Sequence, residues 1–274
     1  MAVNEHEFKE LLESFDQAFR DMNSYLKQYE ETVIRIIDSP SSGGLSSIVQ
    51  HAPITHRIKK PQSALDTLSR RQHDRIELAL LKKNIEDSGG NWESFCDAWH
   101  MRDKIHETEP FTSLDDMHKS MHDLIGLRIS LYFPRDVEKV VDYFTKHEKF
   151  EVVVPASRKG GIAQDFKMVR KLMAEGEEAY EQASHPTFAG YKSTHMVIKL
   201  KDGIFPGQEH SRGAVIEVQI GTIIMHAWSQ IEHDIIYKRL GNRVPSTEEK
   251  RLLDLINGIV TTGEVALEQL ASLR

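Results

Sequence analysis

The sequence predicts a protein of the α/β class, in which short strands alternate with helices. Apolar residues recur at helical spacing over long stretches, which indicates amphipathic helices. Other short segments are apolar throughout or alternate apolar with polar residues, as strands do. These strand candidates are residues 127–131, 150–155, 194–200 and 215–220. The length of 274 residues allows one large domain with helical extensions at both ends.

The composition is typical of a soluble globular protein, with 39% hydrophobic and 28% charged residues. No window approaches the roughly eighteen apolar residues that a membrane span needs, so we expect no contact with membranes. The net charge of −7 argues against sequence-independent coating of nucleic acid. Cys96 is the one cysteine, and the first residues lack the pattern of a secretion signal. We therefore expect a reducing, cytoplasmic location.

Residues 1–47 are predicted to form an N-terminal helical extension. Apolar residues from Phe8 to Ile36 keep helical spacing for about eight turns, which predicts one long amphipathic helix. The segment DSPSSGG at 38–44 ends this helix, because Pro cannot continue it and paired glycines favour irregular backbone.

Cations gather just before a second predicted helix, which starts near Pro61. Arg57, Lys59 and Lys60 surround a short extended piece at this point. The free N–H groups and the dipole of a helix N-terminus add to such charges, so an anion site is one interpretation. A solvated run of charge is the other.

The helical pattern continues from Asp74 to Glu109. We expect one stripe of side chains along this segment and, on another stripe, an aromatic cluster that belongs to the core. The stripe comprises Ile76, Leu80 and Lys83, and the cluster comprises Trp92, Phe95, Cys96 and Trp99.

Two of the predicted strands have polar side chains near their starts. Asp123 precedes the strand at 127–131, which carries Arg128 and leads into a helix with Val137 and Phe144. Further polar residues stand near the start of the strand at 194–200, namely Tyr191, Lys192 and His195.

The segment from Gly213 to Asn242 is predicted to form a strand that is followed directly by a helix. Alternation puts Glu217 and Gln219 on one face of the strand, with the apolar residues on the other. A carboxylate in so apolar a strand indicates either a solvent-exposed sheet face or a metal or proton-transfer site. The second interpretation needs another carboxylate. Beyond Asn242, Ser246 and Glu249 predict a capping box that begins a C-terminal helix or helix pair.

Several chemistries can be compared on this basis. His226 and His233 lie about 10.5 Å apart along one helix, too far to bind a single zinc ion. No nucleophile elbow is present. Phosphate chemistry fits better, because Asp123 and Glu217 could share a divalent cation. Cations at Arg57, Lys59, Arg128 and Lys192 could then neutralise a polyphosphate, and Tyr191 could stack on a base.

Taken together, four segments resemble the successive motifs of the RelA/SpoT-type (p)ppGpp synthetase domain. They are THRIKKPQSAL, HDLIGLRISLYF, GYKSTHMVIKL and VIEVQIGTIIMHAWSQIEHDIIYK. The resemblance implies a mixed β-sheet of about five strands flanked by helices, related to nucleotidyltransferases. It also implies transfer of the β,γ-pyrophosphate of ATP to the 3′-hydroxyl of GDP or GTP, with release of AMP. The chain is similar to a small alarmone synthetase, with the synthetase domain at 48–242, a helical insertion around 72–120 and a C-terminal helical extension at 243–274.

The same resemblance implies roles for individual residues. Asp123 and Glu217 would bind Mg²⁺, and Glu217 would also be the candidate base. The ATP site would comprise Arg57, Lys59, Ser63 and Arg128, with the two arginines sandwiching the adenine. The acceptor site would comprise Tyr191, Lys192, His195 and Gln219.

Some positions differ from the family pattern. Thr67 and Gly221 stand where the family usually has Lys and Arg. The alternatives for the acceptor are an adenine nucleotide or the 3′ end of a tRNA. A non-catalytic nucleotide sensor is a further alternative, and the terminal helices could mediate homo-oligomerisation.

Overall fold

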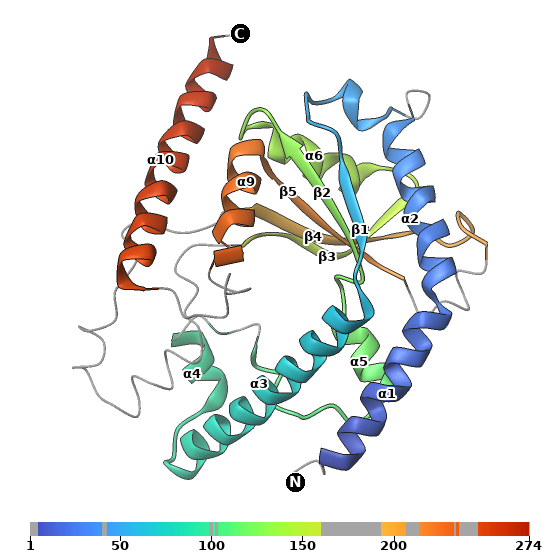
Figure 1. The fold of residues 1–274 in the computed structure, drawn as a ribbon, viewed down its shortest axis with the longest axis vertical. Helices are drawn as coiled ribbons and strands as arrows, with labels where there is room; N and C mark the ends of the chain where they lie inside the picture. Colours follow the sequence, from blue (N-terminus) through green and yellow to red (C-terminus); the bar gives the residue numbers. More distant parts are fainter. Residues whose placement is uncertain are drawn as a thin grey trace. The chain divides into compact units, whose positions relative to one another are not determined.

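The computed structural model describes residues 5–39, 43–98, 101, 104–159, 193–206, 214–232, 234–235 and 246–273. Helices and a five-stranded sheet make up this part of the chain (Figure 1). In chain order the elements are α1 (Glu5–Asp21), α2 (Asn23–Asp38), η2 (Leu45–Ser47), β1 (Thr55–Ile58), α3 (Pro61–Asp87), α4 (Trp92–Ala98), α5 (Leu114–Ser120), β2 (Ile125–Leu131), α6 (Asp136–Lys146), β3 (Phe150–Lys159), β4 (Ser193–Leu200), β5 (Ile216–Thr222), α9 (Ile223–Glu232) and α10 (Thr247–Ser272).

The chain divides into two compact units. One contains α1, α3, α4 and α5, and the other contains α2, η2, the sheet, α6, α9 and α10. The chain passes between them after Asp21, after Lys59 and after Met121. The domain boundaries predicted at 47/48 and 242/243 stay a prediction.

The predicted single N-terminal helix is wrong, because the structure has two helices with a turn at Met22. Met22 keeps α-helical dihedral angles, and its carbonyl still accepts from Leu26 N at 2.9 Å. The apolar spacing therefore runs on across the turn, which explains why the sequence reads as one helix.

In the first unit, the long helical segment is also interrupted. α3 ends at Asp87 and α4 begins at Trp92, because Gly89 adopts a φ of +79°, which L side chains rarely adopt. Ile76 and Leu80 of the predicted stripe lie on α3 and are 37% and 55% exposed. The core cluster of this unit comprises Leu78, Leu81, Ile85, Trp92, Cys96 and Met101. Trp92 and Cys96 are thus buried, as predicted.

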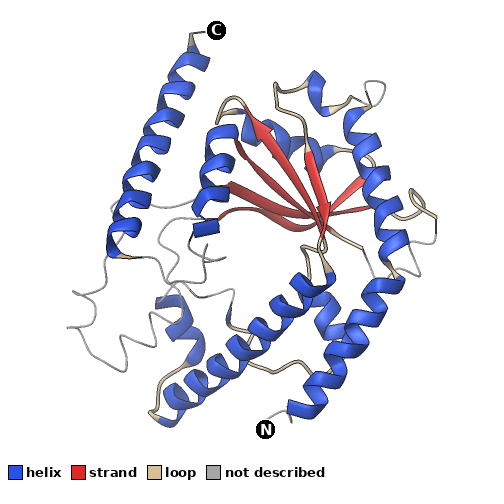
Figure 2. Ribbon diagram, in the orientation of Figure 1, coloured by secondary structure: helices blue, strands red, loops and turns tan. Residues whose placement is uncertain are grey.

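The second unit is built on a mixed sheet, whose strands are red in Figure 2. The strand order is β1-β2-β5-β4-β3. β2 and β5 are parallel, and the other neighbouring strands are antiparallel. The four predicted strands and the mixed five-stranded sheet are confirmed. β1, the fifth strand, is the short extended piece around Arg57.

Strand register assigns the side chains to two faces. Ile198 pairs with Ile216 and Met196 with Val218, so these buried residues share one apolar face. α6 covers this face, since Phe144 contacts Phe150 of β3 with ring centroids 5.3 Å apart. The opposite face carries Glu217 and Gln219 and is less completely covered.

α9 covers the part of the polar face around Gly221. α9 starts directly after β5, and Thr222 Oγ1 accepts from Met225 N at 3.2 Å to cap it. α10 packs against α9 through Met225, Trp228, Leu253 and Val260. α10 is one continuous helix, and the predicted capping box between Ser246 and Glu249 is present. Among the described residues, no helix has the length and apolar character needed to cross a membrane.

Candidate functional site

A polar pocket of about 150 Å³ lies on the sheet face that carries Glu217 and Gln219. Its walls come from β1, the start of β2, the first half of β5 and α9, all within the second unit. The lining residues are Thr55, His56, Arg57, Asp123, Gly126, Leu127, Arg128, Glu217, Gln219 and Gln230. Five of the ten residues that the sequence assigned to the site therefore line one pocket.

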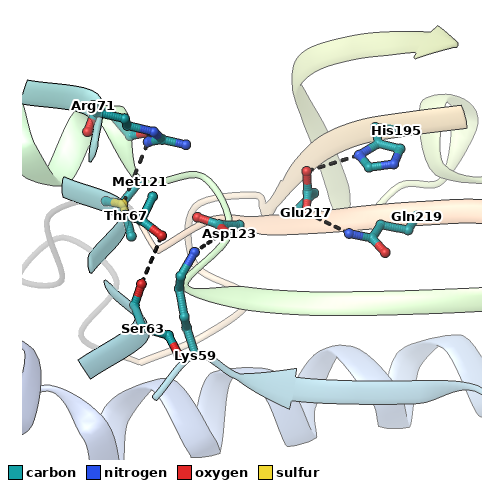
Figure 3. Close-up of polar contacts among 10 residues, drawn as sticks. Lys59, Ser63, Thr67, Arg71, Met121, Asp123, His195, Glu217 and Gln219 are labelled. Carbon is teal, nitrogen blue, oxygen red and sulfur yellow. Dashed lines mark hydrogen bonds and ion pairs between the residues drawn. The ribbon is translucent and has the colours of Figure 1, made fainter. Parts of the chain in front are cut away.

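The Glu217 carboxylate is held by hydrogen bonds on both oxygens (Figure 3). His195 Nδ1 lies 3.1 Å from Oε1, and Gln219 Nε2 donates to Oε2 at 3.0 Å. β4 and β5 are antiparallel with His195 opposite Gln219, so the imidazole reaches Glu217 diagonally across the pair. The sheet itself thus fixes where the carboxylate points.

These contacts also set the charge of Glu217. Burial alone would raise its pKa, but the hydrogen bond and charge of His195 oppose this, helped by Gln219 and the charge of Lys59. The net effect lowers the pKa of Glu217 to about 2. The carboxylate is therefore ionised at neutral pH.

Asp123 supplies the second carboxylate. It stands just before β2, and Lys59 stands just after β1, so antiparallel pairing brings the two ends together. Lys59 N donates to Leu124 O at 2.8 Å, and Lys59 Nζ contacts Asp123 Oδ2. Asp123 Oδ1 is buried and has no hydrogen-bond partner among the described residues. A buried carboxylate oxygen without a partner is costly, so this oxygen is suited to bind a cation.

The donor set fits a hard divalent cation that is completed by substrate. Within the described residues no three His, Cys, Asp or Glu side chains form a metal cluster. Two carboxylates are, however, what Mg²⁺ typically takes from a protein, with waters and substrate phosphates as its other ligands. Asp123 and Glu217 line the same pocket, and one oxygen of Asp123 is available.

Two arginines lie on the same sheet face as Glu217. Arg57 of β1 pairs with Gly126 of β2. A Cβ added at Gly126 would lie 3.7 Å from Arg57 Cγ, so the arginine side chain lies next to Gly126. Arg128 is opposite Gln219 in the register, and its Nη2 donates to Gln219 Oε1 at 3.4 Å. Both arginines line the pocket. Planar cations on one wall suit a nucleobase or a phosphate.

His226 of α9 lies over the same face, beyond Gln219. A Cβ at Gly221 would come within 3.2 Å of its Nε2, and that nitrogen donates to Ile129 O at 3.2 Å. Burial and the charge of Arg128 lower the pKa of His226 to about 4. His226 is therefore neutral at pH 7, and it fills the space next to Gly221.

The remaining predicted residues are placed as follows. Tyr191 and Lys192 lie outside the described residues. Ser63 lies in the first turn of α3, in the other unit, so its phosphate contact stays a prediction. In that unit Thr67 donates to Ser63 O at 2.8 Å, and Arg71 is held by Ser120 O.

Sequence reasoning missed Gln230, Gly126 and His226. Gln230 lies two turns into α9 and lines the pocket, while its Nε2 donates to both carboxylate oxygens of Asp234 at 3.0 Å. No spacing rule marks such a residue, because its role depends on how α9 lies on the sheet. Gly126 could have been suspected from its place inside a strand.

Two carboxylates and several cations around one pocket define a site for a polyphosphate with a divalent cation. The family model described as "Region found in RelA / SpoT proteins" matches residues 96–242, more than half of the chain. The chain therefore belongs to the RelA/SpoT family.

Similar proteins include two from Bacillus subtilis (strain 168). GTP pyrophosphokinase YwaC is 30% identical over 130 residues, which are 47% of this chain and 49% of that protein. GTP pyrophosphokinase YjbM is 29% identical over 134 residues, 49% of this chain and 50% of that protein. The match thus spans about half the length of these relatives. Among solved structures, small alarmone synthetase 2 from Bacillus subtilis has a TM-score of 0.49 at 19% identity, covering 91% of this chain and 95% of that chain.

Proposed function

We propose that the protein is a pyrophosphokinase that transfers the β,γ-pyrophosphate of ATP to the 3′-hydroxyl of GDP or GTP. Family membership and the two relatives called GTP pyrophosphokinases support this reaction. The observation that carries the proposal is the pairing of Asp123 with Glu217 in one pocket, beside Lys59, Arg57 and Arg128. Phosphoryl transfer needs mainly positioning and charge stabilisation, which this set of groups provides.

Mg²⁺ is the proposed cofactor, held by Asp123 and Glu217. When bound, it would neutralise phosphate charge and polarise the phosphorus that is attacked. Asp123 Oδ1 is the oxygen that is free for this purpose. Lys59, now paired with Asp123 Oδ2, is close enough to this carboxylate to contact phosphate oxygens on the same cation.

Arg57 and Arg128 are proposed to hold the adenine of ATP between them. A guanidinium plane stacks well on an aromatic ring, and both side chains line the pocket from adjacent strands. Arg128 is oriented by Gln219, and His226 is next to it as a neutral group that adds no competing charge at pH 7. Ser63 is proposed as a further ligand of the ATP phosphates.

The reaction balances as a single displacement. The 3′-oxygen of the acceptor attacks the β-phosphorus, the bond from that phosphorus to the α–β bridging oxygen breaks, and AMP leaves with the bridging oxygen. The hydroxyl proton passes to a base. The family resemblance gives Glu217 this role too, but a pKa of about 2 makes it a weak proton acceptor. We therefore place its main contribution in binding the cation.

The acceptor site is proposed to comprise Tyr191, Lys192, His195 and Gln219. His195 and Gln219 both contact Glu217, so an acceptor that touched them would lie next to the carboxylate. Tyr191 would stack on the acceptor base. We also propose that 48–242 forms the synthetase domain, with an insertion around 72–120 and helical extensions at 1–47 and 243–274.

The decisive experiment uses ATP labelled at the γ-phosphate together with a panel of acceptors. We expect label in a guanosine tetra- or pentaphosphate and an equal amount of AMP. Label in a new adenine nucleotide product, or in tRNA, would instead identify that molecule as the acceptor in place of the guanine nucleotide. Magnesium-dependent ATP binding without AMP from any acceptor would refute the enzymatic proposal and leave a nucleotide sensor.

A further inference from the structure

The two arginines of the polar pocket can hold a purine base but cannot tell one purine from another. A guanidinium plane stacks on either ring system, so Arg57 and Arg128 give affinity without selection. Adenine and guanine differ at position 6, where adenine has an amino group that donates and guanine has an oxygen that accepts. A residue that selects the base must therefore present a hydrogen-bonding atom of one kind to that position.

Gln230 of α9 is placed where it can meet the edge of such a base. It lines the pocket together with Arg57 and Arg128. His226, four residues earlier on α9, lies over the sheet with its Nε2 3.2 Å from Ile129 O. Residues four apart share one face of a helix, so Gln230 also lies over the sheet.

Asp234 orients the amide of Gln230. The amide Nε2 donates to both carboxylate oxygens of Asp234 at 3.0 Å. An ionised carboxylate can only accept, so the nitrogen end of the amide must face it. Within the described part of the chain, Gln230 Oε1 accepts no hydrogen bond. The end of the amide that is left for a ligand is therefore an acceptor.

The other uncharged polar side chains of the pocket are less suited to this role. The amide of Gln219 is engaged at both ends. His56 precedes Arg57 on β1, so the two side chains point to opposite faces, and His56 Nδ1 lies 3.0 Å from Glu30 Oε1. The hydroxyl of Thr55 can donate or accept, so it would bind either purine. Gln230 is the side chain that offers a fixed acceptor.

We infer that Gln230 selects the donor nucleotide by its base, with Oε1 accepting a hydrogen bond from the 6-amino group of adenine and Asp234 holding the amide in that orientation. The inference rests on the proposed function, because it takes the base between Arg57 and Arg128 to be that of ATP. A 6-oxopurine in the same place would put two acceptors against each other with no proton between them, which disfavours its binding.

The test measures equilibrium binding of two α,β-methylene triphosphates to the full chain in the presence of Mg²⁺. One carries adenine and the other hypoxanthine, a 6-oxopurine without the 2-amino group of guanine. Carbon replaces the oxygen that leaves in the proposed reaction, so binding is measured without turnover. We expect the wild-type protein to bind the adenine compound at least about 10-fold more tightly. Equal affinities would overturn the inference.

Gln230→Met should bring the two affinities to within about 2-fold of each other, because methionine keeps the length of the side chain but lacks a strong acceptor. Gln230 is exposed, so we expect thermal unfolding to be unchanged. An undiminished preference for adenine in this variant would overturn the inference. So would a loss of affinity confined to GDP, measured alongside, because it would place Gln230 in the acceptor site.

Gln17→Met is the matched control. Gln17 of α1 is exposed, and its Nε2 donates to Asp21 Oδ1 at 2.9 Å across the same spacing of four residues. It does not line the pocket. The loss of such a helical pair by itself should therefore leave the preference for adenine unchanged. An equal loss of preference in Gln17→Met would contradict a specific role for Gln230.

Asp234→Asn tests the orientation of the amide. Asparagine can donate as well as accept, so Gln230 can then turn either end to the base. The preference for adenine should fall by about 3-fold or more while stacking is retained. An unchanged preference would contradict the positioning role of Asp234.

The labelled-transfer assay separates this inference from the proposed function. Selective binding of the adenine compound by a protein that forms no AMP from ATP with any acceptor would refute the pyrophosphokinase and leave the selection by Gln230 standing. AMP formation with equal binding of the two bases would do the reverse.

Discussion

His195 of β4 holds the carboxylate of Glu217 on β5, with Nδ1 3.1 Å from Oε1. The contact joins residues 22 positions apart in sequence and follows from the register that puts His195 opposite Gln219. Gln219 takes the other oxygen of the same carboxylate. Glu217 is thus oriented before any substrate binds, which lowers the cost of binding a cation there.

Glu217→Gln should reduce pyrophosphate transfer by at least about 100-fold, the usual scale for removing one electrostatic group from an active site. The amide keeps the shape of the side chain but cannot neutralise a cation. Labelled transfer measures the loss, and thermal unfolding checks the fold. Glu151→Gln is the matched control, because Glu151 is exposed on β3 and pairs with Lys199. Full activity of Glu217→Gln would remove its assigned role.

Asp123→Asn should raise the Mg²⁺ concentration needed for half-maximal activity by about 10-fold or more. The change removes charge from the carboxylate whose Oδ1 has no hydrogen-bond partner among the described residues. A magnesium titration of the reaction, after treatment with a chelator, measures the shift. An unchanged magnesium requirement would place the cation elsewhere.

Arg128→Ala should raise the KM for ATP by about 10-fold, with a smaller change in the KM for the acceptor. The loss comes from the stacked guanidinium plane, so Arg128→Lys should not restore the affinity. Arg20→Ala on α1 serves as a control, since that arginine forms an exposed pair with Asp16. Full rescue by lysine would show that charge alone matters at this position.

Gly221→Ala should destabilise the fold by about 1–3 kcal/mol, the typical cost of overpacking. The new Cβ would lie 3.2 Å from His226 Nε2 and 3.3 Å from its Cε1. In a His226→Ala background, the same change should cost much less, because the clashing ring is gone. Urea unfolding of the four proteins measures this coupling. Purely additive effects would contradict the contact.

The stability of the protein should fall as the pH drops from about 6.5 to about 4. The pKa of His226 is lowered from 6.5 to about 4 in the fold, so the unfolded chain takes up a proton first in this window. The loss amounts to about 3 kcal/mol at its largest. His226→Gln can keep the donor to Ile129 O but cannot titrate. Its unfolding free energy should therefore be flatter over this range, and an equal slope in both proteins would refute the assignment.

The sequence by itself determined which residues share a face. Strict alternation put Glu217 and Gln219 on the same face of β5. The alternating apolar and polar residues at 127–131 predicted β2, with Arg128 on it. Such patterns are local, because backbone geometry repeats every two residues in a strand and about every 3.6 in a helix.

Tertiary structure decided which of these faces meet. Local spacing cannot show that β2 lies beside β5, that Lys59 contacts Asp123, or that His226 covers Gly221. It also failed at Met22 and Gly89, where single residues interrupt helices without breaking the apolar period. Strand order, register and helix placement depend on packing of the whole chain, so the pocket exists only once the sheet has formed.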